Sequence, residues 1–534
     1  MNQDSGGPLQ LFGDFDFVGG DNTAPDPMQN RQICINFYPE VSQDSPKEVL
    51  ALLGCPGLVQ LCAAPGGGAP GFTSTMTAWP VPSSVTNLPV RGMWELPGGV
   101  QALTVIGSVC YLVTLATPAM ANAFPTLALT SVGTLATNSG PVCIRDNNAG
   151  GYAVIVDGPN GYFYNISTQA FTQISDPAFL GADRAAFIDG WWIFNRPGTQ
   201  TFYTNYPQYG EAFSGSYYAL KDAAPDNLVT LIELKELLWL IGDKTTEVWY
   251  DAGGANFPFQ RLSGVLIQSG CKARHSVSRF SAAGLDALIW FGRSERGENV
   301  ILRTKGFTTE VVSTPAFSAE VSTYPITSDA IGYTYQEDTH DFYVLTFPTA
   351  DVTWVYDSQS GMLHKRLSYD PYMTTPGNPA SPPGFHRHRS NCFLNFAGMR
   401  IVGDYQNGAI YQLTRKAYTD AGWPLLAKRR SPHIWDKGQR GRVFMASLQL
   451  EFSPGQGNSS GMGTNPQATL TVSRDGGWTF GQRWPASIGQ QGSFRNRAMW
   501  RKLAFGRDNI VDVEVIDPVP RDLIGATLRA FSEA

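Results

Sequence analysis

Seven segments of the chain share one pattern: a strand-like run rich in aromatic and β-branched residues, a turn rich in Gly, Asp and Asn, and a second run of the same kind. Successive segments begin 49, 39, 46, 50, 55 and 57 residues apart. This spacing is close to the roughly 40–50 residues of a four-stranded propeller blade. The sequence therefore predicts an all-β fold built around a six- or seven-bladed β-propeller. The segments begin near Leu103, Tyr152, Trp191, Leu237, Ala287, Phe342 and Met399.

The blade count stays open at this point, because the segment near Leu103 could complete a blade or belong to an inserted domain. The 56 glycines, 36 prolines and 12% aromatic residues are typical of a strand-rich globular chain, and 534 residues exceed one ordinary core. No window approaches the roughly 18 apolar residues of a membrane helix, and the first ten residues lack a classical export signal. We therefore expect the seven cysteines to be reduced and buried.

Composition divides the chain into three parts. Residues 1–50 are polar except for the strand-like run 33–40, which predicts an extended N-terminal arm that lies on a larger body. Residues 51–420 contain the repeats and are expected to form the propeller. Long loops or a small inserted domain are expected at 63–90 and 370–385, and loops of this length are usually functional or interfacial.

Residues 421–534 are expected to form a C-terminal antiparallel β-domain that contacts the rest of an assembly. Its runs 443–452 and 468–475 alternate apolar and polar residues, as half-buried strands do. The stretch 454–467 between them is rich in Gly, Ser and Asn and is expected to project as a flexible loop.

Charge is distributed unevenly between the two ends. Residues 1–60 contain eight acidic and two basic side chains, whereas 428–507 contain thirteen Lys or Arg and three Asp or Glu. Complementary patches can dock copies of a protein to each other, and a basic patch can also contact DNA. We expect docking, with DNA contact as the alternative. The residues expected at this interface or near DNA are Lys428, Arg429, Arg430, Lys437, Arg440, Arg442, Arg495, Arg497, Arg501 and Lys502.

The motifs that could carry chemistry have structural interpretations. Ser473, Asp475, Gly477 and Phe480 match an Asp-box, a hairpin in which Ser and Asp side chains bind turn amides. It is expected to stabilise a turn. A glycosidase of the sialidase kind would need an arginine cluster, a tyrosine nucleophile and carboxylates as well.

A possible zinc half-site is present at His386, His388 and Cys392, but arginines separate its members and no complementary His or Cys pair follows. No phosphate-binding glycine loop and no ordered Ser, His and Asp set is found. We therefore expect no catalytic residue, no cofactor and no metal.

Residues 237–277 and 286–314 resemble the core of the tail hub or nozzle proteins of short-tailed bacteriophages, also called packaged-DNA stabilisation proteins. The resemblance rests on the TEVWYD element (246–251), the step from Phe257 to Arg261, and the IWFGR and ILRTKGF runs. The C-terminal runs TVSRDGGWTFGQRW (471–484) and RNRAMWRKLAFGR (495–507) resemble that family's closing element. About two-thirds of the chain is covered.

This resemblance implies a structural protein of the virion tail, assembled in the host cytoplasm as a homohexameric ring below the portal and adaptor rings. Its lumen would continue the DNA channel and pass double-stranded DNA non-specifically, its distal end would retain the packaged genome, and its outside would mount tail fibres or spikes. Two alternatives are a carbohydrate-binding or glycosidase-like propeller for host-surface recognition and an intracellular propeller scaffold.

Overall fold

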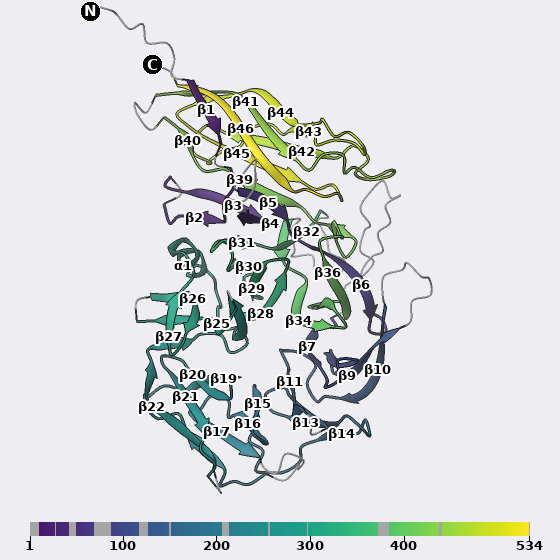
Figure 1. Ribbon diagram of the computed structural model, residues 1–534, viewed down its shortest axis with the longest axis vertical. Helices are drawn as coiled ribbons and strands as arrows, with labels where there is room; N and C mark the ends of the chain where they lie inside the picture. The colour runs from purple at the N-terminus through teal and green to yellow at the C-terminus, as the bar shows by residue number, and fades with distance from the viewer. Residues whose placement is uncertain are drawn as a thin grey trace, which may run out of the picture.

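The chain folds into a β-propeller with a β-sandwich attached to its rim (Figure 1). The computed structural model describes residues 10–15, 17–26, 28–41, 50–68, 87–116, 126–148, 151–205, 213–254, 257–282, 284–295, 297–371, 384–436 and 441–532. Most of the two long loops expected at 63–90 and 370–385 lies outside these ranges. Figure 1 views the propeller with its blades arranged around a centre and the sandwich at the top of the view.

Seven sets of antiparallel strands form the blades of the propeller in the described part of the chain, and in blades 1 to 6 the strands follow sequence order from the centre outward. Blade 1 consists of β7 (Val90–Glu95), β8 (Gln101–Ile106), β9 (Val109–Ala116) and β10 (Thr126–Thr134), and blade 2 of β11 (Cys143–Asp146), β12 (Tyr152–Val156), β13 (Gly161–Asn165) and β14 (Phe171–Gln173). Blade 3 consists of β15 (Ala185–Ile188), β16 (Trp191–Asn195), β17 (Thr201–Asn205) and β18 (Tyr218–Leu220), and blade 4 of β19 (Leu228–Leu234), β20 (Leu237–Gly242), β21 (Thr246–Asp251) and β22 (Phe259–Ile267).

In blade 5 the innermost strand is split, because β23 and β24 pair one after the other with the same edge of β25. Blade 5 consists of β23 (Ser269–Cys271), β24 (Ser278–Ala282), β25 (Leu285–Ser294), β26 (Gly297–Lys305) and β27 (Thr308–Val311). Blade 6 consists of β28 (Ile331–Glu337), β29 (His340–Phe347), β30 (Val352–Asp357) and β31 (Leu363–Lys365). Blade 7 consists of β34 (Ser390–Phe396), β35 (Met399–Asp404), β36 (Ala409–Thr414) and β6 (Gly57–Ala63).

The propeller is closed by a strand from the start of the chain. β6 pairs antiparallel with β36, so that Leu58 lies opposite Leu413, and it supplies the outer strand of blade 7. The prediction of an all-β propeller is confirmed, and the open choice of six or seven blades resolves to seven. The segment near Leu103 forms β8 of a complete blade.

Neighbouring blades are held together by apolar cores that lie between their sheets. Trp290, for example, is fully buried with Trp239 and Val248 between blades 4 and 5. Burying a ring of this size stabilises the fold by about 3 kcal/mol. The strands rich in aromatic and β-branched residues therefore form the blades because each must fill the space on both sides of its sheet.

The sandwich consists of two sheets that pack around the core residues Met445, Leu448, Leu470 and Val513. The strand expected at 443–452 is β41, which alternates buried and more exposed residues. One sheet contains β1 (Gln10–Asp14), β4 (Phe37–Val41), β5 (Leu50–Gly54), β46 (Leu523–Ser532), β41 (Val443–Phe452) and β44 (Ala498–Gly506). The other contains β2 (Asn22–Thr23), β3 (Arg31–Ile35), β39 (Ala427–Arg430), β40 (Ile434–Trp435), β45 (Asp508–Val515), β42 (Gln467–Ser473) and β43 (Trp484–Ser487).

The N-terminal strands are part of this sandwich. β1 and β5 pair with β46, and β3 pairs with β39. The sequence divides the chain at residues 50 and 420, whereas the sheets of the structure join 10–54 to 427–532 within the same chain.

The propeller and the sandwich share one sheet. β3 meets β31 of blade 6 in parallel at Ile35 and Lys365, so that an 11-stranded sheet runs from blade 6 into the sandwich. Asn36 fastens this junction, since its side chain donates to the Leu367 and Leu426 carbonyls at 2.7 Å and accepts from the Leu367 amide at 2.9 Å. Its φ of 56° lies in the left-handed region, which asparagine tolerates better than most residues.

The helix α1 (Pro315–Val321) joins blades 5 and 6 and is capped by Thr314, whose side chain accepts from the Phe317 amide. Among the described residues, no helix has the length and apolar composition to cross a membrane. The remaining strands are β32 (Leu367–Asp370), β33 (Gly384–Arg387), β37 (Thr419–Asp420) and β38 (Trp423–Pro424).

Candidate functional site

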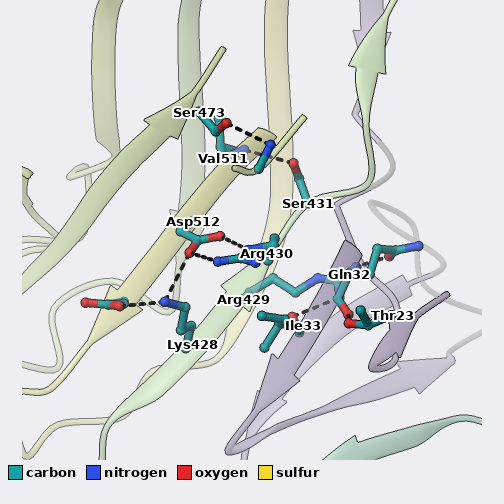
Figure 2. A network of polar contacts seen from close by, with 12 residues as sticks. Thr23, Gln32, Ile33, Lys428, Arg429, Arg430, Ser431, Ser473, Val511 and Asp512 are labelled. Carbon is teal, nitrogen blue, oxygen red and sulfur yellow. Dashed lines mark hydrogen bonds and ion pairs between the residues drawn. The ribbon is translucent and has the colours of Figure 1, made fainter. Parts of the chain in front are cut away.

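Three of the basic residues expected at an interface lie next to each other on β39, where propeller, sandwich and N-terminal strands meet (Figure 2). The middle one, Arg429, is fully buried. Its Nε donates to the Phe17 carbonyl at 2.7 Å, its Nη1 to the Gly20 carbonyl at 3.0 Å, and its Nη2 to Gln32 Oε1 at 2.5 Å. Arg429 therefore binds the N-terminal segment of its own chain and does not reach the surface.

The two neighbours of Arg429 point to the other side of the strand. β39 pairs with β45 in a register that places Arg430 opposite Asp512 and Lys428 opposite Glu514. Arg430 binds both Asp512 oxygens, at 2.6 and 2.8 Å, and Lys428 Nζ lies 3.0 Å from both Asp512 Oδ2 and Glu514 Oε1 (Figure 2). Cross-strand pairs of opposite charge stabilise a sheet. Within the sandwich these basic side chains are already neutralised.

The rest of the expected basic set is exposed or lies outside the described residues. Lys437 and Arg440 lie outside the described residues. Arg497 is near Glu451, with Nε 3.4 Å from Oε1. Arg501 and Lys502 lie on β44, the edge strand of the first sheet. The exposed members are Arg442, Arg495, Arg497, Arg501 and Lys502.

Exposed apolar side chains lie among these cations. Phe444, Met499 and Phe505 are 39%, 40% and 42% exposed, and Phe444 is opposite Phe505 in the register of β41 and β44. The Arg442 guanidinium lies 5.3 Å from the centre of the Phe505 ring. We call this set the β44 surface, and it comprises Arg442, Phe444, Met499, Arg501, Lys502 and Phe505. Sequence reasoning found its cations but missed its aromatic residues, although Phe444 occupies an outward position in the alternation of 443–452.

A second possible site lies at the centre of the propeller, where a cavity of about 400 Å³ is lined by residues that include Arg91, Arg274, Arg387, Asp329 and Tyr405. These residue types are the ones a sialidase-like centre would need. The arginines, however, are already engaged. Arg91 is buried and donates to four main-chain carbonyls, Arg274 pairs with Asp183 at 2.5 Å, and Arg387 stacks 3.7 Å from the Tyr405 ring centre. The cavity therefore lacks a set of free guanidinium groups that could hold a sugar carboxylate.

Comparison with known families identifies the chain. A family model described as Bacteriophage P22 Gp10, beta-propeller, matches residues 110–418. A second model, described as Bacteriophage P22 Gp10, beta-sandwich, matches residues 428–530. The chain belongs to the Bacteriophage P22 Gp10 family. It is a phage stabilisation protein and a component of the virion, and the resemblance seen in the sequence is confirmed. Its family is one of structural proteins.

Other comparisons add little about this Gp10-family chain. No curated protein matches its sequence. Among solved structures, the N-terminal domain of Nup159 aligns at 8% identity and a TM-score of 0.34, covering 72% of this chain and 98% of that one. A chain of the mitotic checkpoint complex aligns at 9% identity and a TM-score of 0.35, covering 65% of this chain and 97% of that one. The extracellular domain of BT4673 from B. thetaiotaomicron aligns at 7% identity and a TM-score of 0.38, covering 64% of this chain and 40% of that one. Similarities at these scores carry no argument about function.

The Asp-box residues of the Gp10-family chain form a tightly bonded turn. Ser473 Oγ accepts from the Gly477 amide at 2.8 Å and donates to Asp475 Oδ1 at 2.6 Å. Asp475 accepts from the Trp478 and Thr479 amides at 3.0 and 2.9 Å. Hydrogen bonds from Ser473 and Thr479 hold the pKa of Asp475 well below its usual range. Gly477 has a φ of 90°, which a residue with a side chain rarely adopts.

This turn contacts the neighbouring strands. The Arg430 guanidinium lies 4.5 Å from the centre of the Phe480 ring, and that of Arg31 lies 4.3 Å from Trp478. These contacts hold the turn against the neighbouring strands β39 and β3.

The histidines of the possible zinc half-site are used in hydrogen bonds. His386 Nδ1 lies 2.6 Å from Asp351, and His388 Nδ1 lies 2.6 Å from Ser390 Oγ. Burial, with the charges of Arg366 and Arg389, holds the pKa of His388 well below its usual range. In the described ranges, no group of three or more His, Cys, Asp and Glu side chains is placed to hold a metal ion.

Proposed function

We propose that this phage stabilisation protein is the hub or nozzle subunit of a short tail. Six copies would form a ring below the portal and adaptor rings and continue the DNA channel. The distal end of the ring would retain the packaged genome, and its outside would mount tail fibres or spikes. Membership of the Gp10 family supports a place in the virion, and the ring and its partners are our proposal.

The observation that carries the proposal is the β44 surface. An edge strand presents unpaired main-chain groups, and proteins usually protect such an edge or use it for pairing. Here the edge has Arg501 and Lys502 on it, with Met499, Phe444 and Phe505 exposed on the same strand and its neighbour. Aromatic residues, Met and Arg are the types enriched in protein interfaces. Neighbouring subunits in a ring meet through two different surfaces, and the β44 surface is suited to be one of them.

The charges of the chain also fit a DNA conduit. A channel that bound phosphates tightly would slow the passage of the genome, because each contact releases counterions and adds affinity. The net charge of the chain is −6, and Lys428 and Arg430 are neutralised by Asp512 and Glu514. We therefore assign the exposed basic residues to contacts with protein rather than with DNA.

The proposal is tested by measuring mass and symmetry. The purified chain is studied by light scattering and negative-stain imaging, alone and mixed with portal and adaptor rings. A ring with six-fold symmetry, formed alone or only on those rings, supports the proposal. A chain that stays monomeric in both conditions contradicts it, and glycan-array binding would then test the carbohydrate-binding alternative.

A further inference from the structure

A groove of about 930 Å³ lies between the end of β22 in blade 4 and the strands β26 and β27 of blade 5. Three apolar side chains in its lining, Leu266, Phe307 and Val311, are exposed. The Phe307 ring stacks on the buried Trp239, with 6.1 Å between the ring centres. Apolar side chains that gather exposed in a hollow mark an interaction surface. We call this hollow the blade 4–5 groove, and it comprises Leu266, Glu295, Glu298, Phe307, Glu310 and Val311.

The charged side chains that line the groove are all acidic, namely Glu295, Glu298 and Glu310. Glu298 lies 3.1 Å from Lys272 and 3.7 Å from Arg293, and Glu310 accepts from Arg303 Nε at 2.8 Å. Glu295 makes no ion pair with the described residues and is exposed. A carboxylate can accept several hydrogen bonds, and the Glu298 side chain is 61% exposed. The groove can therefore receive further cations.

The outward face of the sandwich has the same kind of apolar centre with the opposite charge. The register of β44, β41 and β46 places Phe444 opposite both Phe505 and Phe531, so that three rings cross the sheet in a row. The next outward row across these strands contains Arg501 and Arg529. An apolar centre with charged residues around it is the usual anatomy of a protein interface.

A β-bulge adds a second cation to β44 beside this row. The register of β41 and β44 shifts between Met445 and Ser447, and Lys502 has a φ of 57°, in the left-handed region. Consecutive residues of a regular strand point to opposite faces, yet Arg501 and Lys502 are both exposed. Bulges re-aim side chains in this way, and unfavourable backbone conformations concentrate at functional sites.

We propose that the β44 surface of one copy docks into the blade 4–5 groove of the next copy. The inference rests on the proposed ring and names the two surfaces that its subunits would use. Phe444 and Phe505 would cover Phe307 and its apolar neighbours, while Arg501 and Lys502 would meet the glutamates. One surface lies on the sandwich and the other on the propeller (Figure 1). Each copy can therefore use both at once, as a head-to-tail contact requires.

The same contact would cover exposed strand edges. In the described part of the chain, β22 and β27 are edge strands of their blades, and β44 is an edge strand of the sandwich. An exposed edge presents unpaired main-chain groups, and proteins usually protect it. Docking β44 beside β22 and β27 would shield all three edges.

The first test exchanges charges across the contact. Glu295→Arg combined with Glu298→Arg should reduce assembly on portal and adaptor rings about tenfold, because like charges would then face each other. Arg501→Glu combined with Lys502→Glu should do the same. A chain with all four substitutions should recover most of the assembly. Asp286→Arg is the matched control, since its side chain is 61% exposed, as that of Glu298 is, but lies outside the groove, and it should leave assembly unchanged.

The second test uses cross-linking and alters none of these charges. Chains with Thr308→Cys, in the groove, and chains with Met499→Cys, on β44, are mixed on portal and adaptor rings and treated with a short bismaleimide. The mixture should give a covalent dimer, and each variant alone should give none. The unaltered chain is the control for its own partly exposed thiols, Cys62 and Cys392.

Three results would overturn the proposal. Rings that tolerate the glutamate reversal, with no cross-link in the mixture, would remove this contact while leaving the ring in place. A dimer formed by Met499→Cys chains alone would show that β44 meets another β44. An unaltered chain that stays monomeric on portal and adaptor rings would contradict the ring itself, and the contact with it.

Discussion

Arg430 binds Asp512 through two parallel hydrogen bonds, with Nε 2.6 Å from Oδ1 and Nη2 2.8 Å from Oδ2. Lys428 shares the same carboxylate at 3.0 Å, so one aspartate that is 2% exposed compensates two cations. This arrangement explains why a run of three basic residues need not face a partner. Loss of the Asp512 carboxylate would remove the anion that Arg430 and Lys428 share, and Lys428 would keep only Glu514.

We predict that Asp512→Asn lowers the apparent free energy of unfolding by about 2–3 kcal/mol. The asparagine keeps the shape of the side chain but leaves Arg430 and Lys428 without their shared anion in a largely buried setting. Urea unfolding at pH 7 measures the change. Glu451→Gln is the control, because its partner Arg497 is 59% exposed and such pairs contribute at most about 0.5–1 kcal/mol. Equal losses in the two variants would contradict the prediction.

Closure of the propeller depends on β6. Leu58 is 1% exposed, pairs opposite Leu413, and packs with Tyr411 and Val402 between blades 6 and 7. We expect Leu58→Ala to cost about 2–5 kcal/mol and to lower the melting temperature measured by calorimetry. Val100→Ala serves as the control, since Val100 is 70% exposed and should change stability by less than about 0.5 kcal/mol. An unchanged melting temperature for Leu58→Ala would show that closure tolerates a cavity at this strand.

His340 makes stability depend on pH. Burial lowers its pKa, but hydrogen bonds to Asp357 at 2.9 Å and Glu40 at 2.6 Å outweigh burial and raise the pKa to about 8. Because the folded pKa lies above the unfolded value of about 6.5, the stabilisation is complete below pH 6.5 and is lost as pH rises through 8. We expect the contribution of His340 to fall by about 2 kcal/mol over this range, measured as the difference between the unaltered chain and His340→Gln in urea unfolding between pH 6 and 8.5.

His340→Gln should remove most of this pH dependence while lowering stability at pH 6. Burial holds the folded pKa values of His275, His364 and His388 well below the unfolded value, so these histidines lower stability below about pH 7 in both proteins, and the difference between the two profiles isolates His340. A stability profile that slopes equally in both proteins would mean that another group is responsible.

The β44 surface can be tested by reversing its charge. Arg501→Glu combined with Lys502→Glu should leave the monomer folded, because both side chains are exposed, and should reduce ring assembly at least tenfold. Light scattering on portal and adaptor rings gives the readout. Arg261→Glu reverses a charge on the propeller, where Arg261 is 44% exposed and 3.6 Å from Asp222. Assembly that is lost to the same degree in both variants would count against a specific role for β44.

The Asp-box should contribute to stability through its hydrogen bonds and not through its exposed ring. Asp475→Ala removes the acceptor for the Trp478 and Thr479 amides and should cost roughly 1–2 kcal/mol. Trp478→Ala removes a ring that is 66% exposed and loses only a surface contact with Arg31, about 0.5–1 kcal/mol. Thermal unfolding compares them, and a larger effect from Trp478 would reverse this ranking.

The repeats could be found in the sequence because each segment start falls on or next to the second strand of a blade. Leu103 lies in β8, Leu237 begins β20 and Met399 begins β35. These strands are packed on both faces, so their residues must be apolar or aromatic. The outer strands gave a weaker signal, since β18 and β27 carry no fully buried residue.

Partners distant in the sequence could not be predicted. The pairing of Leu58 with Leu413 depends on the curvature of the whole ring, and no local pattern encodes it. In the same way, the basic run at Lys428 and Arg430 looks like a docking patch until β45 places Asp512 and Glu514 opposite it. Charge counts over a window report composition, whereas burial and pairing decide which of those charges reach the surface.

The closing strand has a consequence for synthesis. β6 leaves the ribosome before the other strands of the propeller, yet its partner β36 is made only after six blades, and β1 must wait for β46. At roughly 5–20 residues per second, the early strands remain unpaired for tens of seconds or longer. The propeller and the sandwich are therefore completed together, late in translation. A chain interrupted after residue 420 would leave its N-terminal strands exposed to aggregation.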